Sequence, residues 1–147
     1  MHLDARPRIP SAGILCACLI ACMTLTACRR APEFIGGKAL KEKSQEVIFV
    51  AAETEVFAEF VLHGQVPSTA RQQHCLYLSQ RLEQAIPRDA RAESGLRQQF
   101  ATLSQLSGEL HTELLHLQQS DDQRSVEEVR RSLANVHSQL SRLKESL

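Results

Sequence analysis

The chain has 147 residues, enough for one domain with a modest hydrophobic core. Its 17 basic and 17 acidic residues balance to a formal net charge of zero, so no overall field draws it to nucleic acid or another acidic polymer. Aromatic residues make up only 4% of the chain, while leucine, glutamine, serine, alanine, arginine and glutamate dominate after position 61. This composition predicts an all-α fold.

The first 27 residues have the organisation of an export signal. Arg6 and Arg8 outweigh Asp4 in the first ten residues, and residues 11–28 carry no charge. A positive segment followed by an apolar one is typical of a signal peptide that is removed after export. The alternative is an uncleaved transmembrane anchor, because about 18 uncharged residues are at the lower limit for crossing a bilayer.

The uncharged run ends in Leu25, Thr26, Ala27 and Cys28. This ending resembles the lipobox of bacterial lipoproteins, in which a branched apolar residue and two small residues precede a cysteine. The resemblance covers residues 1–28 only and implies cleavage after residue 27, a diacylglycerol on Cys28 and further acylation of the new amino terminus. Two or three acyl chains would form a lasting anchor. Arg29, where an aspartate would retain such a protein in the inner membrane, implies transport to the outer membrane, facing the periplasm.

Cysteine use follows from this leader. Three cysteines would be removed with it: Cys16, Cys18 and Cys22. Cys75 is then the only free thiol, and an odd cysteine in an oxidising compartment could pair with another molecule. Cys75 shares a helical face with Leu78 and Leu82, so we expect it to be buried and inert.

After the leader, residues 28–37 contain Pro32 and the pair Gly36 and Gly37, which predicts a flexible lipidated tether. Such a segment reaches at most about 30 Å, so the folded domain, 38–147, is expected close to the membrane. Residues 38–63 have mainly helical spacing of their apolar residues, and Gly64 and Pro67 are stop signals. The β-branched and aromatic residues of 47–50 and 56–62 leave strands as an alternative.

A second helix is predicted from Pro67 to Pro87, with Leu76 among its apolar residues. Asp89 is placed to cap a third helix, whose heptad pattern covers 96–117 with a break at Ser107. Gly95 and Gly108 weaken that helix, so either it frays before Gly95 or Gly108 allows a neighbour to approach closely.

The polar stretch 118–124 predicts a turn, and Ser125 with Glu128 three residues later forms a capping-box pattern. The helix expected after it has three full heptads, the strongest periodic pattern in the chain. Its apolar residues are Val126, Val129, Leu133, Val136, Leu140, Leu143 and Leu147.

Helices over 96–117 and 126–147 have matching lengths, which predicts an antiparallel αα-hairpin of coiled-coil type with the leucine stripes facing each other. With short connections throughout, an antiparallel bundle of about four helices would bury every stripe. The alternative is a homo-oligomer, or a complex with a partner, formed through helix 126–147.

The histidines after the leader lack metal-ligand spacing, although His63 and His74 flank a turn and could approach each other. Acidic pairs fall at turns or first turns, where they favour the helix dipole, and no phosphate loop or catalytic motif is present. The sequence therefore predicts no enzyme, no metal and no cofactor beyond the lipid on Cys28. The histidines considered are His63, His74, His111, His116 and His137.

These features favour a membrane-anchored structural or interaction component of an envelope assembly, such as one for secretion, conjugation or envelope maintenance. A protein partner is expected, and the exposed polar faces after residue 96 could dock it. The alternative is a periplasmic module that senses a metal or a small ligand. The basic residues of those faces are Arg124, Arg130, Arg131, Arg142 and Lys144.

Overall fold

The computed structural model describes residues 33–147, so the predicted leader and lipobox lie outside the described residues. Nearly all of the described part is helical, which confirms the all-α class. None of its helices is long and apolar enough to cross a membrane. The elements are β1 (Phe34–Ile35), α2 (Gly37–Leu62), α3 (Ser68–Ala85), β2 (Arg91–Ala92), the 3-10 turn η1 (Ser94–Leu96), α4 (Arg97–Gln119) and α5 (Gln123–Glu145).

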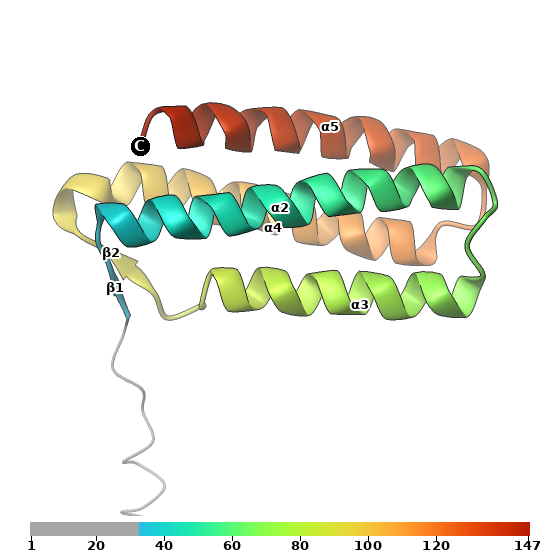
Figure 1. Cartoon of the computed structure of the whole chain (residues 1–147), viewed down its shortest axis with the longest axis horizontal. Coiled ribbons are helices and arrows are strands. Elements are labelled where there is room, and N and C mark those ends of the chain that lie inside the picture. Colours follow the sequence, from blue (N-terminus) through green and yellow to red (C-terminus); the bar gives the residue numbers. More distant parts are fainter. Residues whose placement is uncertain (1–32) are drawn as a thin grey trace, which may run out of the picture. The chain divides into compact units, whose positions relative to one another are not determined.

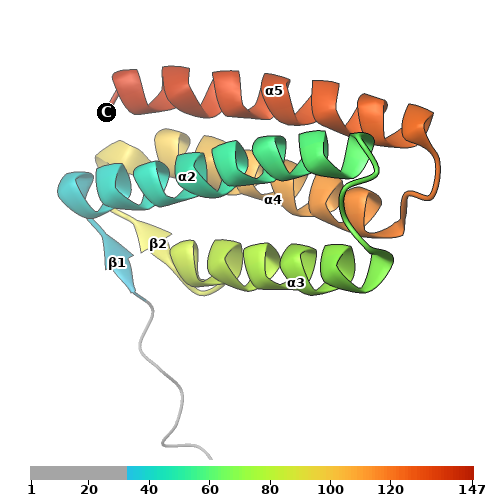
Figure 2. The ribbon, with the colours of Figure 1, turned by 45° about the vertical axis from the view of Figure 1, so that its right-hand side comes forward.

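The four long helices lie side by side in the two ribbon views (Figures 1 and 2). α2 packs against α5 and α3, and α4 packs against the same two helices from the other side. The chain therefore brings its first and last helices into contact. β1 and the C-terminus lie at the same end of the domain, where α2 begins and α5 ends (Figure 1).

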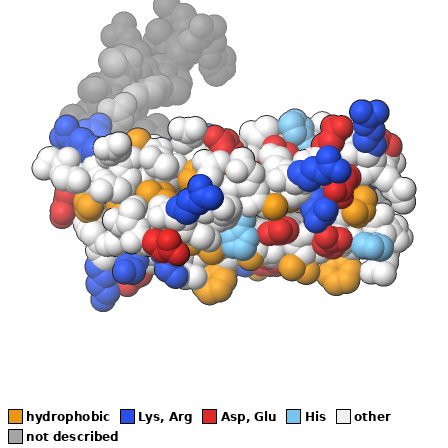
Figure 3. Space-filling model, turned by 90° about the horizontal axis from the view of Figure 1, so that it is seen from above, with side chains coloured by type: hydrophobic (Ala, Val, Ile, Leu, Met, Phe, Trp, Pro, Cys, Tyr) orange, Lys and Arg blue, Asp and Glu red, His pale blue; other side chains and the backbone are white. Residues whose placement is uncertain are grey.

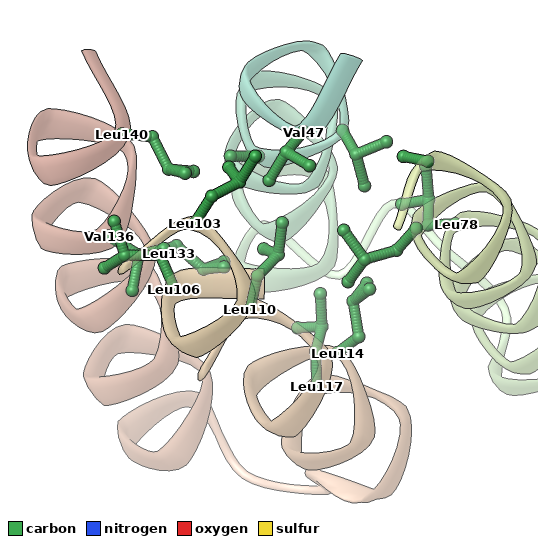
Figure 4. Packing of buried hydrophobic residues seen from close by; sticks show 14 of the residues in the cluster. Val47, Leu78, Leu103, Leu106, Leu110, Leu114, Leu117, Leu133, Val136 and Leu140 are labelled. Atoms are coloured by element: carbon green, nitrogen blue, oxygen red, sulfur yellow. The ribbon is translucent and has the colours of Figure 1, made fainter. Parts of the chain in front are cut away.

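The core forms where the apolar stripes of the helices meet. Side chains from all four helices, including Val47, Leu78, Leu110 and Leu133, point toward one another (Figure 4). The heptad predicted for α5 is confirmed, because six of its seven apolar positions are buried and Leu147 packs against the same cluster. In α4, Ser107 is buried in the cluster, at the heptad position where it replaces an apolar residue.

Residues 47–62 form one continuous part of α2, so the strand alternative is wrong. The buried positions Val47, Val50, Ala51, Thr54 and Ala58 follow helical spacing, and burying that face outweighs the β preference of single residues. Thr54 satisfies its buried hydroxyl by donating to the Val50 carbonyl over 2.7 Å. The predicted stop is confirmed, because Gly64 follows α2 with a φ of 67° that favours glycine.

The predicted tether of residues 28–37 is wrong for its last part, because residues 33–37 belong to the fold. Ile35 is fully buried, and β1 pairs in parallel with β2, placing Phe34 opposite Arg91. The Lys43 Nζ lies 3.2 Å from the Glu33 Oε1. Sequence patterns do not predict this pairing, because two apolar residues are too few to show a period and their partner strand, Arg91–Ala92, lies far along the chain. Residues 28–32 lie outside the described part.

The boundaries of α3 and α4 differ in one respect from the prediction. α3 ends at Ala85, just before Pro87, as expected, but Asp89 does not cap the next helix. β2 and η1 follow instead, and α4 begins at Arg97. α4 thus begins after Gly95, as predicted by the alternative in which the third helix frays before that glycine. A Cβ on Gly108 would meet nothing within 4 Å, so the alternative in which a neighbouring segment approaches Gly108 closely is wrong.

The N-terminus of α5 also differs from the capping-box prediction. Asp122, not Ser125, is the capping residue, and its side chain accepts hydrogen bonds from the Ser125 N–H at 2.9 Å and the Ser125 hydroxyl at 2.6 Å. Ser125 lies inside the first turn. Both residue types cap helices well, so the sequence could not choose between them.

We expect Asp122→Ala to lower the melting temperature at neutral pH. Asp122→Asn should keep a melting temperature close to that of the wild type, because asparagine caps helices as well as aspartate does. The Ser125 hydroxyl and N–H lower the pKa of Asp122 in the folded chain. Its ionised form thus stabilises the fold above the unfolded pKa of about 3.9, and this contribution is lost as the pH falls through the folded value. Thermal melts from pH 7 to pH 2 should show the penalty of Asp122→Ala shrinking with acidification; a constant penalty would contradict the assignment.

Candidate interaction site

The most distinctive surface feature is an apolar hollow of about 650 Å³ between α2 and α3, here called the aromatic groove. An adjoining hollow extends it along α3 to Ala70, Gln73 and Tyr77. The groove itself is lined by Phe49, Ala52, Glu53, Val56, Phe57, Phe60, His74 and Arg81.

Helical spacing explains why α2 supplies most of this surface. Phe49, Val56 and Phe60 are separated by seven and four residues, so they lie on one face, away from the buried positions of the same helix. Their exposed fractions are 56%, 57% and 49%. Apolar side chains gather along one edge of the domain in Figure 3. Phe60 is among the apolar residues whose spacing over 38–63 predicts one helical face, and the structure exposes it instead of burying it with Val47 and Ala51.

Exposed apolar residues are unevenly distributed over the described elements. Among the large ones, Leu115 alone belongs to α4 and none belongs to α5. Leu76, one of the apolar residues of the predicted second helix, is exposed on α3. The remaining residues all come from β1, α2 and α3, and are Phe34, Phe49, Val56, Phe60, Leu76 and Tyr77.

His74 and Arg81 line the α3 side of the groove. The His74 ring packs between Phe57 and Tyr77, with ring centroids 4.3 and 5.9 Å away. Arg81 lies 5.8 Å from the centre of the Tyr77 ring, within the range of a cation–π contact. These contacts fix the α3 side chains against α2, so the groove is preformed in the folded chain.

Acidic residues near the groove are paired within the chain. Arg81 donates to Glu46 at 2.6 Å and to Glu53 at 2.7 Å, and Glu53 also lies 3.6 Å from His74. The hydrogen bond that Arg81 donates to Glu46 is the largest reason why the pKa of Arg81 is raised, so its guanidinium stays charged. The carboxylates of Glu46 and Glu53 therefore do not make the groove strongly acidic.

Four of the five histidines considered for metal binding lie within 4 Å of a glutamate. His63 lies 3.9 Å from Glu59, whereas His74 lies near Glu53, so the predicted pair contacts different acids. His137 of α5 lies 3.0 Å from Glu55 of α2. Within residues 33–147, no group of three histidine, cysteine or acidic side chains could hold a metal ion.

The basic side chains expected to face a partner are partly engaged on α5 itself. Arg130 and Arg131 both donate to Glu127, and Arg124 lies 3.4 Å from Glu128. The hydrogen bonds from Arg130 and Arg131 lower the pKa of Glu127 to about 2, and the bond from Arg130 is the largest cause. The exposed face of α5 is thus a network of paired charges, as in a solvated helix.

Cys75 is buried as predicted, and burial raises the pKa of its thiol to about 11. Because the thiolate is the reactive form, we expect no alkylation by iodoacetamide at pH 8 in the folded chain and rapid alkylation after denaturation. Mass spectrometry of the peptide containing Cys75 would measure both. Equal labelling before and after denaturation would show that the thiol is accessible.

Comparison with protein-family models, curated proteins and solved structures finds no match to this chain. The described residues form an all-α domain with an exposed aromatic groove between α2 and α3. Cys28 and the preceding Leu25, Thr26 and Ala27 lie outside those residues.

Proposed function

We propose that this chain is a bacterial lipoprotein, held at the membrane by a lipid on Cys28, whose domain is a structural or interaction component of an envelope assembly. The observation that carries the proposal is the uncharged run ending in the lipobox-like residues 25–28. On this proposal residues 1–27 are removed, and Arg29 directs the protein to the outer membrane, facing the periplasm.

The structure of the domain supports a role in binding. An exposed apolar hollow bordered by paired charges suits contact with another surface better than it suits catalysis, which needs a nucleophile beside a base. We propose further that the four helices form an antiparallel bundle, with α4 and α5 as a hairpin of coiled-coil type. Such a scaffold would hold both its groove and its polar α4 and α5 surfaces rigidly, the latter for a protein partner.

Palmitate labelling of growing cells tests the anchor. We expect radiolabelled palmitate to mark the wild-type chain and a Cys22→Ala variant but not a Cys28→Ala variant. Cys22 is the matched control, because it lies in the same uncharged run. The marked chains should also lack residues 1–27 when their mass is measured.

Two results would sink the proposal. One is a wild-type chain that never takes up label in a host able to process such leaders. The other is equal labelling of the Cys28→Ala variant, which would place the lipid elsewhere. Fractionation on a density gradient would then report whether the labelled chain travels with outer or inner membranes.

A further inference from the structure

We propose that the aromatic groove is the face by which the domain lies on the phospholipid bilayer that carries its anchor. The inference rests on the lipid attachment proposed above and adds which side of the domain meets the membrane. It also leaves the polar surfaces of α4 and α5 turned toward the periplasm, free for a protein partner.

The connection to the proposed lipid is short. The described fold begins at Glu33, so only residues 28–32 lie between the lipid and the first folded residue. Five extended residues span roughly 17 Å, whereas the 26 residues of α2 make a helix roughly 39 Å long. The N-terminal end of the domain therefore stays within half a helix length of the bilayer. Phe60 lies roughly 35 Å along α2 from Gly37, so the groove meets lipid when α2 lies along the membrane surface.

Exposed apolar side chains concentrate on the elements at the N-terminal end of the described chain. Phe34, the second residue of the fold, is 68% exposed, and β1 leads directly into α2, which carries Phe49 and Phe60. The next helix, α3, exposes Leu76 and Tyr77, whereas α4 and α5 together expose a single large apolar residue, Leu115. A domain whose exposed apolar residues belong to some of its elements and whose polar faces belong to the others is suited to lie at a membrane interface.

The charges beside the groove do not favour an electrostatic contact. Arg81 pairs with both Glu46 and Glu53 and offsets one of their two negative charges, so these side chains give the groove no net positive charge for anionic headgroups. Near the connection the charges are mixed, with Lys43 against Glu33 at 3.2 Å. The contact is therefore apolar rather than electrostatic, and it should depend little on anionic lipid or on salt.

Tryptophan fluorescence tests the orientation, because the chain contains no tryptophan of its own. Phe60→Trp puts a reporter in the groove, about 16 Å farther along α2 than Phe49. Leu115→Trp is the matched control, a large exposed apolar position on α4. Each lipidated chain is reconstituted on phosphatidylcholine vesicles with brominated acyl chains, which quench from within the bilayer, and acrylamide is added as the quencher in water.

We expect brominated lipid to quench the Phe60→Trp reporter at least twofold more than the Leu115→Trp reporter, and acrylamide to show the reverse order. Equal access of acrylamide to both reporters would overturn the inference. So would a Phe60→Trp reporter shielded from both quenchers, since that result means that protein, for example a second copy, covers the groove.

The same variants, produced as residues 28–147 and coupled through Cys28 to a maleimide lipid, separate this inference from the proposed function. If brominated lipid quenches the Phe60→Trp reporter but cells attach no palmitate, the proposed lipid attachment is refuted and the proposed orientation stands. If cells attach palmitate but acrylamide reaches the Phe60→Trp reporter on the vesicles, the orientation is refuted and the lipid attachment stands.

Discussion

Replacing Leu110 with alanine is expected to lower the free energy of unfolding by about 2–5 kcal/mol. Leu110 lies in the middle of α4 and is fully buried among leucines and valines of the other helices (Figure 4). Truncating it removes the apolar transfer energy of the side chain and leaves a cavity that close-packed helices cannot fill completely. Urea unfolding followed by circular dichroism at 222 nm would measure the loss.

Leu115→Ala is the matched control, since it makes the same chemical change on the same helix at a position that is 40% exposed. Its expected cost is below about 1 kcal/mol, because the exposed side chain keeps much of its contact with solvent in the folded state and its truncation leaves no cavity in the core. If the two variants lost similar amounts of unfolding free energy, Leu110 would not be on the buried face of α4 and Leu115 would not be on its exposed face.

The features that local sequence determines were predictable. The stripe of α5 repeats every three and four residues without a miss, and a pattern of that kind identifies the buried face before any neighbour is known. The end of α2 at Gly64 is equally local, because it depends on a backbone conformation that glycine adopts at no steric cost.

The face of α2 was harder to predict. From Val47 to Val50 every residue is apolar, so spacing alone could not decide which of them would point inward. Packing against α3 and α5 buries Val47 and Val50 and leaves Phe49 exposed. The aromatic groove is therefore a consequence of tertiary packing, and its only trace in the sequence is an apolar surplus on α2 beyond what one buried stripe requires.

The pairing of β1 with β2 could not be predicted at all, and it shortens the connection that the proposed lipid on Cys28 would have to the domain. Hydrogen bonds at both ends of the pair join the two segments, from the Arg91 N–H to the Glu33 carbonyl at 2.9 Å and from the Glu93 N–H to the Ile35 carbonyl at 3.2 Å. So short a pair is not stable by itself. The buried side chain of Ile35 must supply most of its stability.

Ile35→Ala is accordingly expected to cost about 2–5 kcal/mol, as for other fully buried aliphatic residues. Phe34→Ala is its control on the same strand, because Phe34 is largely exposed and should contribute little to the free energy of unfolding. Urea titration of both variants would give the two values. If residues 33–37 were a flexible tether, the two substitutions would be equally mild.

If Cys28 carries the proposed lipid, loss of β1 would also lengthen the connection to the membrane. With Glu33 to Gly36 released, nine residues instead of five would separate the lipid from α2, and the reach would grow from roughly 17 Å to roughly 30 Å. A domain on the longer connection can leave the bilayer surface more readily, so the Ile35→Ala substitution should weaken brominated-lipid quenching of the Phe60→Trp reporter. Unchanged quenching in a variant whose β1 has detached would show that the groove holds the membrane without help from the short connection.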